Sequence, residues 1–283
     1  MSLWLLPVVF AIFIWWFSTG VVILLDGLPH KTFRWSLVIS SLLAVGAIAG
    51  LIHTASKTTV ADSYCAFTCG LLLWGWHELS FLTGWITGPR KQGSSSDCSR
   101  GRQAIQAINA ILWHELWLLA SGLILLWITW GQANQVGLWT FAVLWLMRAS
   151  AKLNLFLGVR NLGLEFLPSH LSYLQFYFRK APMNALFPFS VTLATGVTAW
   201  LVVGALEPSA GEATRVGQLL VATLLGLAVL EHWMLVIPWS PTALWRWALK
   251  SRERASRQDP PAPPGSTSPV LTISADEKLL HAR

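Results

Sequence analysis

Long apolar runs alternate with short polar connections along the whole chain. Because an α-helix rises about 1.5 Å per residue, about 20 apolar residues cross the roughly 30 Å hydrocarbon core of a bilayer. The pattern therefore predicts an all-α, polytopic membrane protein with about seven transmembrane helices. The predicted spans lie near Leu3 to Leu25, Trp35 to Ile52, Val60 to Phe81, Ala104 to Trp130, Val136 to Leu157, Asn184 to Leu206 and Val216 to Ile237.

Composition supports the same class of protein. Hydrophobic residues make up 54% of the 283 residues and charged residues only 12%, whereas soluble proteins carry about a quarter charged residues. The first run lacks a basic segment before it and an Ala-x-Ala-like cleavage site before Asp26-Gly27. It is therefore expected to be a retained helix and not a signal peptide.

Lys and Arg concentrate in alternate connections, which predicts the orientation in the membrane. One side of the seven predicted spans holds 16 of these residues and the other side only Lys57 and Arg215. Positive charge gathers on the cytoplasmic side, so the N-terminus is expected to be periplasmic and the C-terminus cytoplasmic. The net charge of +7 then needs no nucleic-acid partner, although membrane lipid is an expected contact.

Residues 1–250 form one predicted transmembrane domain, with two unusual cytoplasmic segments and a tail. Residues 84–103 contain GSSSDCSRG and predict a flexible loop. Residues 158–183 mix aromatic and charged residues and predict an amphipathic, interfacial or half-buried helix. Residues 251–283 are basic, then proline-rich, without apolar periodicity, and predict a disordered cytoplasmic tail.

Ionisable residues inside the predicted spans are the main candidates for a site. Four helices place them in the same half of the bilayer, where a charge at the helix centre costs about 2.5 to 3.5 kcal/mol, so they should face one another. Two interpretations stay open: an ionic network in which the two basic residues neutralise the carboxylates and hold the bundle together, or a ligand or proton site. The eight residues are His77, Glu78, His114, Glu115, Arg148, Lys152, Glu231 and His232.

The sequence WHEL occurs twice, at residues 76–79 and 113–116, which suggests a repeated ligand pair. Adjacent His and Glu point about 100° apart around a helix, so one helix cannot easily aim both at one ion. Bundle di-metal sites use Glu-x-x-His, and neither that spacing nor His-x-x-x-His occurs. No metal site and no catalytic residue are therefore predicted.

A tetrapyrrole is easier to accommodate, because one neutral imidazole can hold its central metal. A large ring needs a small neighbour one turn back, and Ala110 precedes His114, Ala228 precedes His232 and Ala49 precedes His53. A structural role for each His remains the alternative. Interior tryptophans could likewise pack between helices or line a site for a flat aromatic ligand; they are Trp15, Trp16, Trp74, Trp76, Trp113, Trp117, Trp145 and Trp233.

Three long segments resemble a known family. They are WWFSTGVVILLDGLP at 15–29, HELSFLTGWITGPR at 77–90 and KLNLFLGVRNLGLEFLPSHLSYLQFYFRKAPMN at 152–184. They are similar to the PuhE-type photosynthetic-complex assembly proteins, found in purple photosynthetic bacteria beside the gene for the reaction-centre H subunit. The resemblance covers roughly residues 1–250. It implies a multi-pass protein of the bacterial inner membrane, cytoplasmic or intracytoplasmic, that supports assembly of the reaction centre and core antenna and influences bacteriochlorophyll supply.

Together these features predict an assembly factor whose polar cluster either stabilises the fold or holds bacteriochlorophyll or a precursor. Residues 158–183 would contact reaction-centre or core-antenna subunits and other assembly factors, through Arg160, Asn161, Glu165 and His170, or would merely seal the cytoplasmic rim. The alternative function is an intramembrane enzyme of tetrapyrrole or lipid metabolism, with or without a metal, that uses His and Glu as acid and base.

Overall fold

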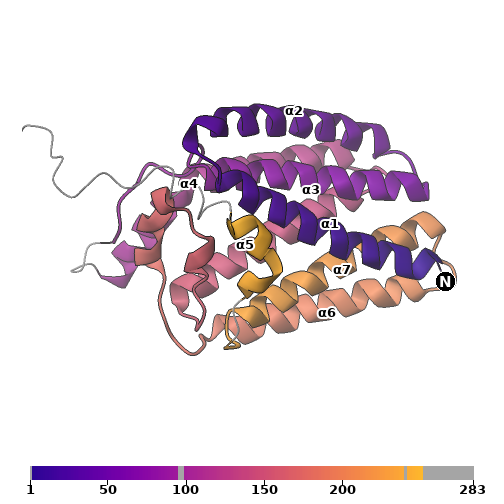
Figure 1. Cartoon of the computed structure of the whole chain (residues 1–283). Coiled ribbons are helices and arrows are strands. Elements are labelled where there is room, and N and C mark those ends of the chain that lie inside the picture. Colours follow the sequence, from indigo (N-terminus) through magenta and orange to yellow (C-terminus); the bar gives the residue numbers. More distant parts are fainter. Residues whose placement is uncertain (1, 95–98, 239–240, 251–283) are drawn as a thin grey trace, which may run out of the picture.

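The computed structural model describes residues 2–94, 99–238 and 241–250, which form a bundle of long α-helices (Figure 1). These parts of the chain contain no β-strand, only an isolated bridge between Val159 and Lys180. The all-α fold class is therefore confirmed, while the tail predicted for 251–283 lies outside the described residues. The long helices are α1 (Ser2–Asp26), α2 (His30–Thr54), α3 (Val60–Leu82), α4 (Arg100–Thr129), α5 (Val136–Leu157), α6 (Leu186–Leu206) and α7 (Glu212–Met234).

Six of these helices, all except α3, are long and apolar enough to cross a membrane, which makes this a polytopic membrane protein. The expectation of about seven apolar spans is thus met by six. The 23-residue α3 is long enough, but it carries Asp62, His77 and Glu78. It lies in the middle of the bundle and packs against α1, α2, α4, α5 and α7 (Figure 1). Because neighbouring helices shield much of it from lipid, α3 can hold polar residues that a lipid-facing helix could not.

Local sequence explains where several helices begin and end. The Thr59 side chain accepts a hydrogen bond from the Asp62 backbone N–H and caps the start of α3. Helix α5 ends at Leu157 and is followed by Gly158, whose φ of 122° is a conformation that favours glycine. The predicted bounds of α5 agree with the structure, and α4 begins at Arg100, four residues before its predicted start.

The segment between α5 and α6 is not a continuous amphipathic α-helix. Its helical parts are two 3₁₀ helices, η1 (Leu164–Phe166) and η2 (Ser169–Tyr177). Gly163, with φ of 61°, comes directly before η1 and separates it from the end of α5. Pro168 lies between η1 and η2, and because the residue before a proline disfavours helical backbone, it separates the two. Within η2, Leu171 and Tyr177 are buried against the ends of α3 and α4. The segment is half-buried, as expected, but as 3₁₀ turns.

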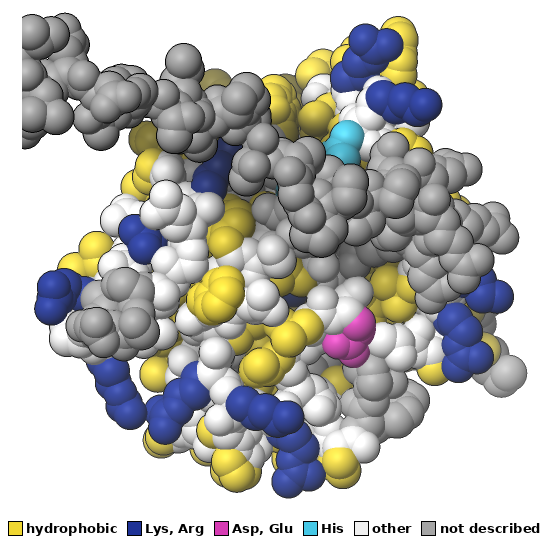
Figure 2. Space-filling model, turned by 60° about the vertical axis from the view of Figure 1, so that its left-hand side comes forward, with side chains coloured by type: hydrophobic (Ala, Val, Ile, Leu, Met, Phe, Trp, Pro, Cys, Tyr) yellow, Lys and Arg dark blue, Asp and Glu magenta, His cyan; other side chains and the backbone are white. Residues whose placement is uncertain are grey.

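Basic side chains gather at one end of the bundle, which we call the basic end. The α1–α2, α3–α4 and α5–α6 connections meet there, and Figure 2 shows Lys and Arg side chains spread over this face. Part of the loop predicted to be flexible is anchored here, since Arg90 Nε donates to the Tyr177 hydroxyl at 2.8 Å; residues 95–98 of that loop lie outside the described residues. The short helix η3 (Pro241–Trp245) lies against the middle of α1.

Candidate functional site

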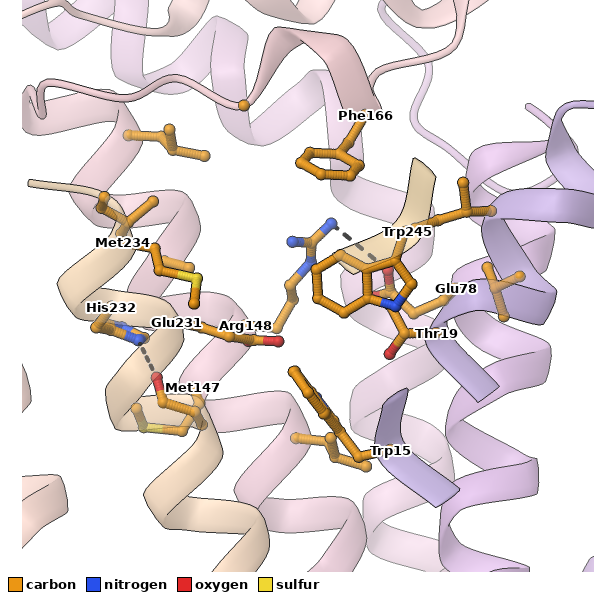
Figure 3. A pocket seen from close by; sticks show the side chains of 18 of the residues that line it. Trp15, Thr19, Glu78, Met147, Arg148, Phe166, Glu231, His232, Met234 and Trp245 are labelled. Carbon is orange, nitrogen blue, oxygen red and sulfur yellow. Dashed lines mark hydrogen bonds and ion pairs between the residues drawn. The ribbon is translucent and has the colours of Figure 1, made fainter. Parts of the chain in front are cut away.

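A cavity of about 560 Å³ lies between α1, α3, α5 and α7, near the basic end. Its walls are mostly apolar and aromatic, with Trp15 from α1 and Trp74 from α3 (Figure 3). Residues 160–166 and Trp245 complete its lining. Its volume falls within the roughly 300 to 1,000 Å³ typical of sites for small molecules and cofactors.

An ion pair between α3 and α5 lies at mid-depth in this cavity. Arg148 Nη2 is 3.5 Å from Glu78 Oε2 (Figure 3). The other carboxylate oxygen of Glu78, Oε1, is buried and has no hydrogen-bond partner among the described residues. An ionised carboxylate has about four lone-pair sites, so the pair leaves Glu78 with unused acceptor capacity.

Glu231, on α7, adds a second carboxylate to the same space. Its side chain is exposed, and Figure 3 shows that it points into the cavity, between Arg148 and Trp15. The Arg148 charge acts on this carboxylate, and the Trp15 indole is its hydrogen-bonding neighbour. In the described part of the chain, the ion pairs within 4 Å are Arg148–Glu78 and Lys152–Glu115, and neither includes Glu231.

His232 borders the cavity but has no free ring nitrogen. Nδ1 donates to the Ala228 carbonyl at 2.9 Å, and Nε2 lies 3.0 Å from the Ser150 hydroxyl. This ring joins α7 to α5, and the imidazole is therefore a structural link at this position, not a ready metal ligand.

The other ion pair closes the contact between α4 and α5, outside the cavity. Lys152 Nζ donates to Glu115 Oε1 at 2.6 Å, and Trp145 Nε1 donates to Glu115 Oε2 at 3.4 Å. Both oxygens of Glu115 thus have a partner. Neither Lys152 nor Glu115 lines the cavity.

His77 and His114 face each other between α3 and α4, with ring centroids 6.5 Å apart. His77 Nε2 lies 2.9 Å from the Ser121 hydroxyl. His114 is buried beside Phe81, and neither of its ring nitrogens has a hydrogen-bond partner among the described residues. Neither imidazole lines the cavity.

The eight ionisable residues singled out from the sequence thus fall into separate groups. Glu78, Arg148, Glu231 and His232 border the cavity, whereas the other four lie around α4. No group of three or more His, Cys, Asp or Glu side chains in the described residues is placed to hold a metal ion.

Three of the four residues expected to contact partners line the cavity instead of forming a separate surface. Arg160 and Glu165 are exposed, in the segment 160–166 that lines the cavity near the basic end. Asn161 caps α7, because its side-chain amide donates to the Met234 carbonyl at 2.7 Å and its backbone N–H to the Leu235 carbonyl at 2.9 Å. His170 lies elsewhere, with Nε2 2.8 Å from the Leu82 carbonyl at the end of α3.

The sequence interpretation missed the aromatic closure of the cavity. Trp16 Nε1 donates to the Leu244 carbonyl at 3.0 Å, and Trp245 Nε1 donates to the Trp16 carbonyl at 3.1 Å. This reciprocal clasp holds η3 against α1 and places Trp245 edge-on to Trp15, with centroids 5.5 Å apart. The Phe166 ring lies 6.1 Å from that of Trp245. The contacts between α1 and η3 join residues more than 200 positions apart, so the periodicity of the sequence does not predict them.

Comparison with known proteins identifies relatives but no described activity. A family described as "Protein of unknown function (DUF3623)" matches residues 1–256. A protein of Rhodobacter capsulatus, named "Uncharacterized 30.4 kDa protein in puhA 5'region", is 37% identical over 247 residues, which cover 86% of this chain and 89% of that protein. Neither name mentions the PuhE type. No solved structure matches the chain.

Proposed function

The chain belongs to the DUF3623 family, and from that premise we propose that it is an assembly factor for the photosynthetic reaction centre and core antenna. The R. capsulatus relative is named for the puhA 5' region, and puhA belongs to the reaction-centre gene cluster. That neighbourhood supports a role in photosynthesis. The resemblance to PuhE-type proteins supports the finer assignment to assembly and bacteriochlorophyll supply.

The observation that carries the mechanism is the cavity between α1, α3, α5 and α7. Apolar walls, tryptophan faces and a few polar groups at mid-depth suit a large, flat, mostly apolar molecule. In this proposal the cavity holds bacteriochlorophyll or a precursor. The protein shields the pigment from water and releases it to newly made complexes.

The basic end is the proposed site of partner contact. Its Lys and Arg side chains favour a cytoplasmic location, in the cytoplasmic or intracytoplasmic photosynthetic membrane. Arg160 and Glu165 are exposed there and also line the cavity. A reaction-centre or core-antenna subunit bound to the segment 160–166 would therefore contact residues that enclose the pigment.

The experiment is purification in mild detergent from pigmented cells, followed by absorption spectroscopy, metal analysis and identification of co-purifying subunits. The proposal predicts stoichiometric tetrapyrrole together with reaction-centre or core-antenna subunits. A colourless protein that still co-purifies with these subunits would contradict the proposal that it carries pigment. Stoichiometric iron or zinc without pigment would favour the alternative function, an intramembrane enzyme of tetrapyrrole or lipid metabolism.

A further inference from the structure

The two carboxylates of Glu78 and Glu231 line the cavity, and they restrict what can bind there. Glu78 Oε1 is buried without a hydrogen-bond partner among the described residues, and Arg148 pairs with the other oxygen. Glu231 is exposed to the cavity, has the Trp15 indole as its hydrogen-bonding neighbour and lies outside both ion pairs of the described residues. Two negative charges beside one guanidinium are costly where water is largely excluded. A ligand that offers an electropositive centre to Glu231 would lower that cost.

The distribution of charge gives the same answer. The cavity lining as a whole is balanced, with Arg148, Arg160 and Lys180 against Glu78, Glu165 and Glu231. At mid-depth, however, the two carboxylates of Glu78 and Glu231 face only the guanidinium of Arg148. An anionic group is disfavoured at this depth. A Lewis-acidic metal centre is favoured.

No histidine of the cavity wall is free to bind such a metal centre. Both nitrogens of His232 are engaged, and His77 and His114 lie outside the cavity. Magnesium is a hard cation that prefers oxygen ligands, carboxylates among them. The donor present at mid-depth therefore matches magnesium better than it matches a metal that selects imidazole.

We propose that the Glu231 carboxylate is the protein ligand to the magnesium of a chlorin-type pigment, an inference that rests on the proposed function. The ring nitrogens do not use all the coordination capacity of magnesium, and one Glu231 oxygen would supply a further ligand. Any proton on that carboxylate is released to solvent when the bond forms. Arg148 compensates the charge of the ligand, and Trp15, Trp245 and Phe166 provide flat faces for the ring (Figure 3).

The test titrates the purified full-length protein, in detergent, with bacteriochlorophyllide a and with its magnesium-free counterpart, bacteriopheophorbide a. Fluorescence of the pigment measures both dissociation constants. We expect the wild type to bind the magnesium form at least about tenfold more tightly, since disturbing a metal site typically changes affinity by about 10- to 100-fold. Glu231→Leu removes both oxygen donors and should abolish this preference by weakening only the magnesium form, whereas Gln would keep a carbonyl oxygen that can also bind magnesium. Glu207 is an exposed carboxylate at the opposite end of the bundle, so Glu207→Leu is the matched control and should keep the preference.

The outcomes separate this inference from the proposed function. If the wild type binds neither pigment, pigment carriage and magnesium coordination both fail. If it binds both forms equally, the pigment site remains and the coordination proposal is wrong. A preference that survives Glu231→Leu would also overturn it. Should that variant not fold, resonance Raman bands that report axial coordination in the wild type decide between oxygen and nitrogen ligation, and a nitrogen ligand would contradict the proposal.

Discussion

The two WHEL segments occupy equivalent-looking positions in adjacent helices but end in opposite situations. In α3, His77 faces α4 while Glu78 faces the cavity and keeps one oxygen unpaired. In α4, His114 faces α3 while Glu115 has both oxygens bonded, by Lys152 and Trp145. The same four residues therefore have two outcomes. In α3 the Glu78 carboxylate lines a cavity and is part of an open pair, with one oxygen unpaired in the described part of the chain. In α4 the Glu115 carboxylate is part of a closed pair, with both oxygens hydrogen-bonded between helices.

The two carboxylates, Glu78 and Glu115, therefore have different roles. A short, fully used ion pair such as Lys152–Glu115 holds two helices in register and leaves nothing for a ligand. The Arg148–Glu78 pair is longer and lies in the cavity next to Glu231, so it should contribute little to helix packing. One oxygen of Glu78 remains without a hydrogen-bond partner among the described residues. We therefore expect stability to depend on the closed pair and ligand binding on the open one.

The largest effect on stability is expected from Lys152→Leu. This change leaves Glu115 without its 2.6 Å partner between α4 and α5. Because the pair is partly buried, the loss should lie between about 1 kcal/mol, the value for an exposed pair, and about 3 kcal/mol, the value for a buried one. Chemical unfolding in detergent measures the change in unfolding free energy. The control is the double variant Lys152→Leu with Glu115→Leu, which removes both charges and should recover most of the loss. No recovery would show that the pair itself is not what stabilises this contact.

A smaller effect is expected from Arg148→Leu. The side chain of Arg148 is 43% exposed and its distance to Glu78 is 3.5 Å, so the loss should be about 1 kcal/mol, as for a solvent-accessible pair. The same unfolding assay compares it with Lys152→Leu. Equal losses in the two variants would remove the distinction between an open and a closed pair.

The smallest effect is expected from His114→Leu. Both ring nitrogens lack a partner among the described residues, and replacing an unsatisfied buried polar group by an apolar one is nearly neutral. Thermal unfolding should change little, whereas the control His232→Leu gives up contacts to Ala228 and Ser150 and should lose about 1 kcal/mol. A strongly destabilised His114→Leu would reveal that this ring has a partner, such as water.

Much of the fold follows from hydropathy alone. The runs of apolar residues predict all seven long helices, because each must satisfy its backbone hydrogen bonds within the membrane. Hydropathy sets α3 apart as the one long helix of the described residues that is not apolar enough to count as a membrane span, but it does not show which helices surround it. The 3₁₀ turns of residues 158–183 depend on Gly163 and Pro168, and an amphipathic pattern does not distinguish them from an α-helix.

The sequence predicts how deep in the membrane the residues of the candidate site lie, but not which of them are in contact. Counting residues along the helices places Glu78, Arg148 and Glu231 in one half of the bundle, and the structure brings these three to one cavity. The same count includes His114 and Lys152, which face other helices, because rotation about a helix axis cannot be obtained from depth. Trp245 closes the cavity by contacts with α1, far away in the sequence, so its position depends on the fold of the whole bundle.

Filling the cavity with a large side chain should prevent the protein from carrying pigment. Gly75 lines the cavity, and a Cβ added there meets no atom within 4 Å, so Gly75→Phe should fill the space while the bundle stays folded. Gly46 on α2 is equally open and lies outside the cavity, which makes Gly46→Phe the matched control. The account predicts that tetrapyrrole co-purifies with the wild type and Gly46→Phe and is lost from Gly75→Phe. Undiminished pigment in a folded Gly75→Phe protein would contradict it.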